Sequence, residues 1–83
     1  MGTSRDDIRR WLSAARDKGS THLMVVCDTF SYEDYPVYCA TPEACLEKHA
    51  RPGDMQKVME VYDMTMDIEQ QIAQQRTMNL PKG

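Results

Sequence analysis

The stretch HLMVVCDTFSYEDYPVYCA, residues 22–40, decides the fold of this chain. It holds two short runs, residues 22–27 and 37–40, rich in the β-branched, aromatic and apolar residues that favour strands. Pro36 precedes the second run, and proline belongs at the start of a strand or on a sheet edge because it has no N–H to donate. We therefore predict a β-hairpin whose connection, residues 28–35, carries three acids and three aromatics.

The first run is apolar on both of its predicted faces. Side chains alternate along a strand, so one face carries Leu23, Val25 and Cys27 and the other carries His22, Met24 and Val26. A strand of this kind is covered on both sides. The cover is either the rest of the chain or a second copy of it.

Helical patterns flank the hairpin. Before it, Ser4 is a suitable N-cap, Gly19 a suitable end, and the apolar positions between them form one stripe: Ile8, Trp11, Leu12 and Ala15. After it, Thr41 and Pro42 provide a cap and a first helical residue, and the breaker at residues 51–53 ends that short helix.

Residues 54–78 predict a long final helix. Its apolar positions cover about twice the width of a usual core-facing stripe. A second copy of the helix would cover the excess, which predicts a homodimer or higher oligomer with an interface at Val61, Met64, Ile68 and Ile72. The alternative is that the helix packs on its own hairpin and first helix. The predicted fold is a single α+β domain, residues 1–83, with the order α-β-β-α-α.

Composition limits the credible functions. The chain has 83 residues and a formal net charge of −3, so we expect no direct DNA binding. The longest apolar run, residues 23–27, is too short to cross a bilayer, and we expect neither a membrane span nor a secretion signal. Three cysteines without framework spacing indicate reduced thiols and a cytoplasmic location.

The sequence contains only weak motifs for metal binding or catalysis. Cys45 and His49 are spaced to lie on one helix face, but no Cys-x-x-Cys pattern accompanies them. Cys27 is a candidate nucleophile; His22 lies at the other end of the same strand, too far away to act as its base, and His49 stays open as an alternative. The acids at 28, 33 and 34 lack the glycine of an EF-hand loop. We therefore predict no enzyme, no metal site and no cofactor.

Two sets of residues are candidates for binding. One predicted ligand site combines a basic line on the first helix with aromatics of the hairpin connection: Arg5, Arg9, Arg16, Tyr32 and Tyr35. The alternative for the arginines is a solvated face that pairs with nearby acids. The second set is an acidic contact surface for a partner, formed by Asp28, Glu33 and Asp34. Tyr32 is expected to face solvent, and Phe30 and Tyr35 to fold inward.

Four segments, residues 10–15, 19–30, 33–38 and 55–62, resemble a family of small uncharacterised proteins encoded by bacteriophages and prophages. The resemblance covers most of the chain and brings no established catalytic or binding residues with it. It implies a small protein of the bacterial host cytoplasm that counters antiviral defence.

Three hypotheses follow. In the first, the protein is a non-enzymatic binder that sequesters an anionic nucleotide signal, cyclic or linear, through its arginines and tyrosines. In the second, it inhibits a host defence protein by presenting its acidic loop as a nucleic-acid mimic. In the third, it is a small metal-dependent or thiol enzyme, against which the missing motifs count.

Overall fold

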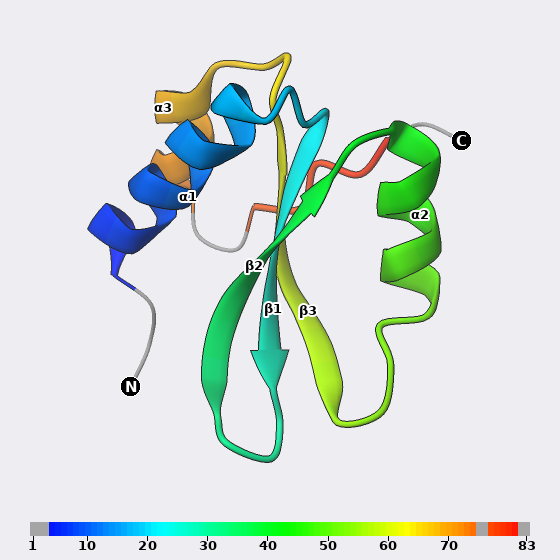
Figure 1. The fold of residues 1–83 in the computed structure, drawn as a ribbon. Coiled ribbons are helices and arrows are strands. Elements are labelled where there is room, and N and C mark those ends of the chain that lie inside the picture. Colours follow the sequence, from blue (N-terminus) through cyan, green and yellow to red (C-terminus); the bar gives the residue numbers. More distant parts are fainter. Residues whose placement is uncertain (1–3, 75–76, 82–83) are drawn as a thin grey trace.

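The computed structural model describes residues 4–74 and 77–81 and confirms an α+β fold. Figure 1 shows helices on both sides of a small central sheet. The elements follow the order α-β-β-α-β-α: α1 Arg5–Asp17, β1 His22–Asp28, β2 Glu33–Cys39, α2 Pro42–Ala50, β3 Gln56–Asp63 and α3 Ile68–Ala73.

The sheet is antiparallel with the strand order β2-β1-β3, so β1 is central. The predicted hairpin is present, because β1 pairs with β2 from His22 opposite Cys39 to Asp28 opposite Glu33. Residues 77–79 extend the sheet beyond β3: the N–H of Val61 donates to the carbonyl of Thr77 at 2.8 Å, and the N–H of Asn79 donates to the carbonyl of Val61 at 2.9 Å.

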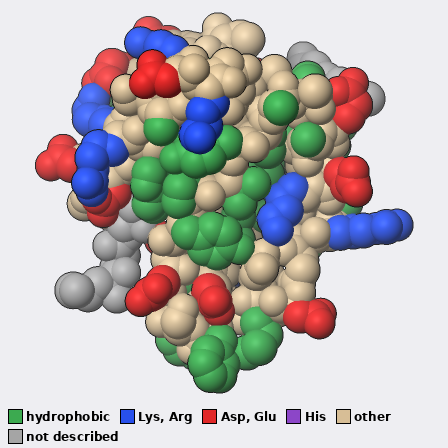
Figure 2. Space-filling view, viewed as in Figure 1, with side chains coloured by type: hydrophobic (Ala, Val, Ile, Leu, Met, Phe, Trp, Pro, Cys, Tyr) green, Lys and Arg blue, Asp and Glu red, His purple; other side chains and the backbone are tan. Residues whose placement is uncertain are grey.

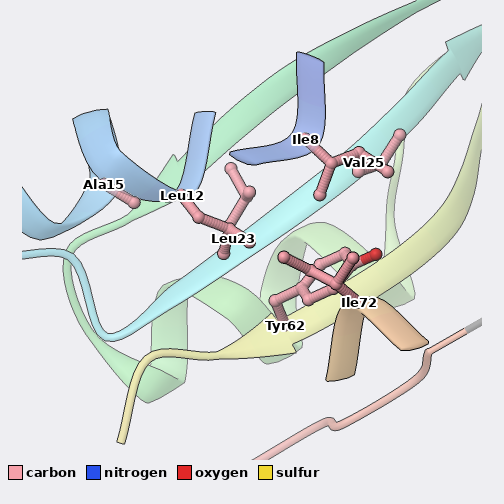
Figure 3. Packing of buried hydrophobic residues seen from close by; sticks show 7 residues of the cluster. All are labelled: Ile8, Leu12, Ala15, Leu23, Val25, Tyr62 and Ile72. Atoms are coloured by element: carbon pink, nitrogen blue, oxygen red, sulfur yellow. The ribbon is translucent and has the colours of Figure 1, made fainter. Parts of the chain in front are cut away.

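Two apolar clusters, one on each face of the sheet, bury β1. The first lies under α1 and α3 and contains Ile8, Leu12, Ala15, Leu23, Val25, Tyr62 and Ile72 (Figure 3). The second lies on the α2 side and contains Met24, Val26, Cys39, Cys45 and Val61. Both faces of β1 are therefore covered within one chain, which settles the choice left open by its two-sided apolar pattern.

The predicted ends of the first two helices are confirmed. The hydroxyl of Ser4 accepts the N–H of Asp7 at 3.1 Å, and that of Thr41 accepts the N–H of Ala44 at 3.1 Å. Gly19 follows α1 with φ +70°, a conformation that glycine adopts without steric cost.

The prediction of a long final helix over residues 54–78 is wrong. Its first half is β3, and among the described residues of this range only Ile68–Ala73 is helical. A β-bulge in β3 explains why its sequence resembles a helix. Val25 is opposite Glu60 and Val26 is opposite Val58, which leaves Met59 without a partner on β1. The extra residue places Val58 and Val61, three apart, in the same cluster, and this spacing imitates a helical stripe.

The residues predicted for a dimer interface lie in the core of the chain itself. Val61 and Ile72 are 0% and 5% exposed, and Met64 and Ile68 are partly buried against the first cluster. β1, α1 and α2 cover these four residues within the chain, whereas Met55, Met59 and Met66, which also contributed to the apolar excess, are 54%, 36% and 50% exposed. The four residues predicted for the interface therefore take part in packing within one chain.

The hairpin connection is shorter than predicted. β2 begins at Glu33, so only residues 29–32 connect the strands, and Pro36 lies inside β2 rather than before it. An edge strand tolerates proline, since its outer backbone groups need no partner strand. Phe30 was expected to turn inward and is instead 76% exposed, whereas Tyr32 faces solvent as expected.

Candidate functional site

The end of the sheet farthest from the helices carries three exposed large apolar side chains. Phe30 and Tyr32 lie in the β1–β2 connection, and Met55 precedes β3; they are 76%, 74% and 54% exposed. The two loops are joined, because the N–H of Thr29 donates to the carbonyl of Met55 at 2.7 Å. We call Phe30, Tyr32 and Met55 the sheet tip. In Figure 1 this end of the three strands extends below all the helices.

Two of the three tip residues have an unfavourable backbone conformation. Among the described residues, Tyr32 and Met55 are the non-glycine residues with positive φ, each at 58°. This left-handed conformation costs about 1–2 kcal/mol for a residue with a Cβ, and bulky side chains adopt it rarely. Glycine would relieve the cost at both positions, so the fold alone gives no reason for a tyrosine and a methionine there.

The hydrogen bonds of the loop hold Tyr32 in this conformation. Its N–H donates to the carbonyl of Asp28 at 2.7 Å. The carboxylate of Asp28 accepts the N–H of Phe30 at 2.8 Å and that of Ser31 at 3.4 Å. Asp28, predicted to contact a partner, therefore shapes the loop. On the other side, Lys48 fixes the approach to Met55 by donating to the carbonyl of Pro52 and to Oε1 of Gln56, both at 2.9 Å.

The tip is acidic as well as apolar. Residues 28–34 contain three acids and no base, and residues 54–57 contain one acid, Asp54, and one base, Lys57. The two segments together carry a net −3, which equals the formal net charge of the whole chain. Figure 2 shows hydrophobic side chains gathered at this lower end, with acidic side chains directly above them.

Cys27 lies next to the tip, in surroundings that disfavour its thiolate form. Desolvation, followed by the Asp34 carboxylate opposite it on β2, raises the pKa of the Cys27 thiol. A raised pKa keeps the thiol protonated, and the thiolate is the reactive form.

The arginines predicted to bind a ligand lie on α1, and two of them have acidic partners. Arg9 donates to both carboxylate oxygens of Glu69 at 2.6 and 2.7 Å. Arg5 donates to the carbonyl of Gln74 at 3.2 Å and lies 3.7 Å from Oε1 of Glu60. Arg16 has no ion pair with any other residue in the described part of the chain.

The structure does not bring these arginines together with the predicted tyrosines. Tyr35 packs against the second cluster, on the α2 side of the sheet, whereas α1 covers the opposite face. Tyr32 belongs to the tip. Within one chain, the arginine line and the two tyrosines therefore form no common site.

The residues considered as metal ligands are also far from forming a common site. Cys45 is fully buried and His49 is exposed, so the two do not share a site despite their spacing. In the part of the chain that the structure describes, no three His, Cys, Asp or Glu side chains converge on a possible metal position.

Comparison with protein-family models, curated proteins and solved structures finds no match. The resemblance to phage-encoded proteins therefore stays a prediction. Across residues 4–74 and 77–81, no helix is long and apolar enough to cross a membrane.

Sequence reasoning missed Met55 as a surface residue, because it was assigned to the apolar side of a long helix. One signal was available: Gly53 and Asp54 directly precede it, a pair typical of a turn rather than of a helix interior.

Proposed function

We propose that this protein is a non-enzymatic binding module that docks its sheet tip on a basic, partly apolar surface of another protein. The observation that carries the proposal is the backbone of Tyr32 and Met55. Both residues hold large side chains in solvent at a conformational cost that the fold does not require. Conformations of this kind concentrate at sites where a function maintains them.

The composition of the tip suits a protein partner. Aromatic residues and methionine are enriched in the centres of interfaces, where they fill apolar pockets of the partner. The surrounding charge of −3 favours a basic rim and accelerates encounter with one. Glu33, exposed at the start of β2, is the member of the predicted acidic set best placed for such a rim.

The resemblance to phage-encoded proteins supplies the biological setting of this proposal. A basic surface that normally binds nucleic acid is one that an acidic protein can occupy in its place. We therefore propose a host antiviral defence protein as the partner, bound in the bacterial cytoplasm, with inhibition as the result. The proposal requires neither a cofactor nor a second copy of the chain.

The test uses a photo-crosslinking amino acid at position 30. A bacterial lysate is separated on heparin, which retains proteins with basic, nucleic-acid-binding surfaces. We expect position 30 to crosslink to a protein of the retained fraction, and excess parent protein to suppress the crosslink. The matched control places the crosslinker at position 10, an exposed position on α1 outside the tip.

Side-chain variants then separate specific docking from general adhesion. Met55→Ser should remove the crosslink, whereas Met66→Ser should keep it, because Met66 is similarly exposed, at 50%, but lies between β3 and α3. Equal crosslinking from positions 10 and 30, or loss of the crosslink in both methionine variants, would contradict the proposal.

The nucleotide hypothesis remains the alternative, and it makes a different prediction. A nucleotide bound by the arginines and tyrosines of two chains would raise the melting temperature of the protein by linkage. A thermal-stability screen against cyclic and linear nucleotides that gives such a rise would favour that alternative over docking through the tip.

A further inference from the structure

A second site lies between α1 and α3, away from the tip. It is a pocket of about 190 Å³ lined by Arg9, Leu12, Ser13, Arg16, Ile68, Glu69 and Ile72. Leu12, Ile68 and Ile72 form an apolar floor that belongs to the first cluster or packs against it. Arg9, Ser13 and Arg16 supply donors from α1, and Glu69 supplies a carboxylate from α3.

The charges of the lining favour an anion. Two arginines and one glutamate give the pocket a net charge of +1, in a chain whose formal net charge is −3. Glu69 is already bound by Arg9, with both carboxylate oxygens within 2.7 Å of one guanidinium nitrogen. Arg16 is left as the uncompensated cation of the pocket within the described residues.

The size of the pocket restricts the ligand. Sites for drug-sized ligands measure about 300–1,000 Å³. A pocket of about 190 Å³ is smaller than these sites. A nucleotide would extend out of it into solvent, whereas a carboxylate on a short branched aliphatic chain fits inside it.

We propose that this pocket binds an organic carboxylate with a small aliphatic group. The carboxylate pairs with Arg16 and Ser13, since guanidinium groups bind carboxylates in a bidentate geometry. The aliphatic group lies over Leu12, Ile68 and Ile72. Two sources offer this chemistry: a free short-chain acid and the C-terminus of a peptide that ends in leucine.

The test is an NMR titration of the full chain at constant ionic strength, followed through the amide signals of Ser13, Arg16 and Glu69. The probe is 4-methylpentanoate, compared with acetate, which lacks the aliphatic group, and with neutral 4-methylpentanamide. We expect saturable binding of the probe with a Kd on the order of 1 mM. Acetate and the amide should each bind at least about tenfold more weakly, because each lacks one of the two contacts.

Variants of the lining residues show which side chains contact the ligand. Arg16→Gln should weaken binding of the probe about tenfold, as expected for the loss of one charge-assisted contact. Glu69→Gln should strengthen binding, since the carboxylate that repels the ligand is removed. The matched control is Arg10→Gln, which removes a cation of α1 that pairs with Asp7 and does not line the pocket. It should change the Kd less than about twofold.

Other results overturn the proposal. Equal binding of acid and amide, or equal effects of Arg16→Gln and Arg10→Gln, would show that no carboxylate site exists. Arg16 also lies in the last turn of α1, where a cation stabilises the helix dipole. A loss of stability in Arg16→Gln without any change in binding would assign it that role alone. Tighter binding of the peptide Ala-Ala-Leu than of 4-methylpentanoate, lost on amidation of its C-terminus, would identify a peptide as the source.

Discussion

Single residues at the sheet tip combine exposure with an unfavourable backbone. For Tyr32, the left-handed conformation costs about 1–2 kcal/mol relative to the usual regions. Glycine avoids this cost, although it loses about 0.5–1 kcal/mol through the greater freedom of the unfolded chain. The balance favours glycine at this position, so stability and the proposed function make opposite demands on one side chain.

We therefore expect Tyr32→Gly to increase the free energy of unfolding by about 0.5–1 kcal/mol, a rise in melting temperature of a few degrees for a chain of this size. Urea unfolding followed by circular dichroism measures the change. Ser31→Gly is the control, since Ser31 is not among the residues with positive φ and glycine there should destabilise. A Tyr32→Gly protein less stable than the parent would show that the tyrosine side chain stabilises the loop.

Gln71 is a buried polar residue, 1% exposed, that joins three segments. Its side chain accepts the N–H of Asp63 at 2.8 Å and donates to the carbonyls of Asp63 and Asp67 at 2.9 and 3.2 Å. Asn79 donates to the same side chain at 2.7 Å. The end of β3, the start of α3 and the C-terminal segment thus depend on one amide.

Truncation of that amide should be costly. Gln71→Ala leaves the N–H of Asp63 without its acceptor and removes one donor from the carbonyls of Asp63 and Asp67, and we expect a loss of about 2–4 kcal/mol in the free energy of unfolding, measured in urea. Gln70→Ala changes the exposed neighbour on the same helix and should stay within about 0.5 kcal/mol of the parent. Similar losses in the two variants would contradict the assigned role of Gln71.

At the scale of elements, α1, β1 and α2 could be predicted from local signals: caps, helical spacing and an apolar run bounded by polar residues. β3 could not, because the bulge at Met59 gives a strand the spacing of a helix. The same error concealed the place of Met55 in the sheet tip and the α1–α3 pocket. Both depend on where β3 begins and where α3 lies, which the residue pattern of 54–78 alone does not determine.

The connection between β3 and α3 should respond to pH. Desolvation raises the pKa of Asp63, but hydrogen bonds from Thr65 and the nearby His22 outweigh it, so the pKa lies below its usual range. The unfolded chain, with a carboxyl pKa of about 3.9, then takes up the proton first as the pH falls. The stabilisation is therefore complete near neutral pH and is lost progressively below about pH 5.

We expect Asp63→Asn to be less stable than the parent at pH 7 and to lose less stability between about pH 5 and pH 3. Urea unfolding at several pH values measures both effects. Asp6→Asn, at an exposed position of α1, is the control and should follow the parent. A parallel fall of the Asp63→Asn and parent curves would show that Asp63 does not carry the pH dependence.

Packing on the α2 side of the sheet should also protect the two buried thiols, Cys39 and Cys45. Cys39 and Cys45 are 2% and 0% exposed, and burial, with the neighbouring Cys39 thiol, raises the pKa of Cys45 to about 12. Cys27 is only half-buried. Under native conditions at pH 8 we expect a thiol reagent to label Cys27 first, and Cys39 and Cys45 only after unfolding in urea. Native labelling of Cys45 at the rate of Cys27 would contradict the buried position of α2.

At the scale of the whole molecule, one chain covers both faces of its own sheet, so we expect it to fold without a second copy. We therefore expect an unfolding midpoint in urea that does not change when the protein concentration is varied about a hundredfold. A dimer that is required for folding would raise the midpoint with concentration. That result would restore the homodimer inferred from the apolar residues of the C-terminal part.

The two proposed binding sites lie on different parts of the molecule. The acidic, apolar tip lies at the free end of the sheet (Figure 1), and the basic pocket lies between α1 and α3. Variants of one site should leave the other intact, since the two share no lining residue. Failure of the tip proposal therefore leaves the pocket proposal standing, and the reverse holds as well.

The most direct test of the central claim is the affinity of the crosslinked partner, once purified, for four proteins: the parent, Phe30→Ser, Met55→Ser and Met66→Ser. Calorimetric titration at low and high salt measures it. We expect the two tip variants to weaken binding at least about tenfold, Met66→Ser to bind as the parent does, and higher salt to weaken every complex. Unchanged affinity in both tip variants would contradict the claim that the sheet tip is the binding surface.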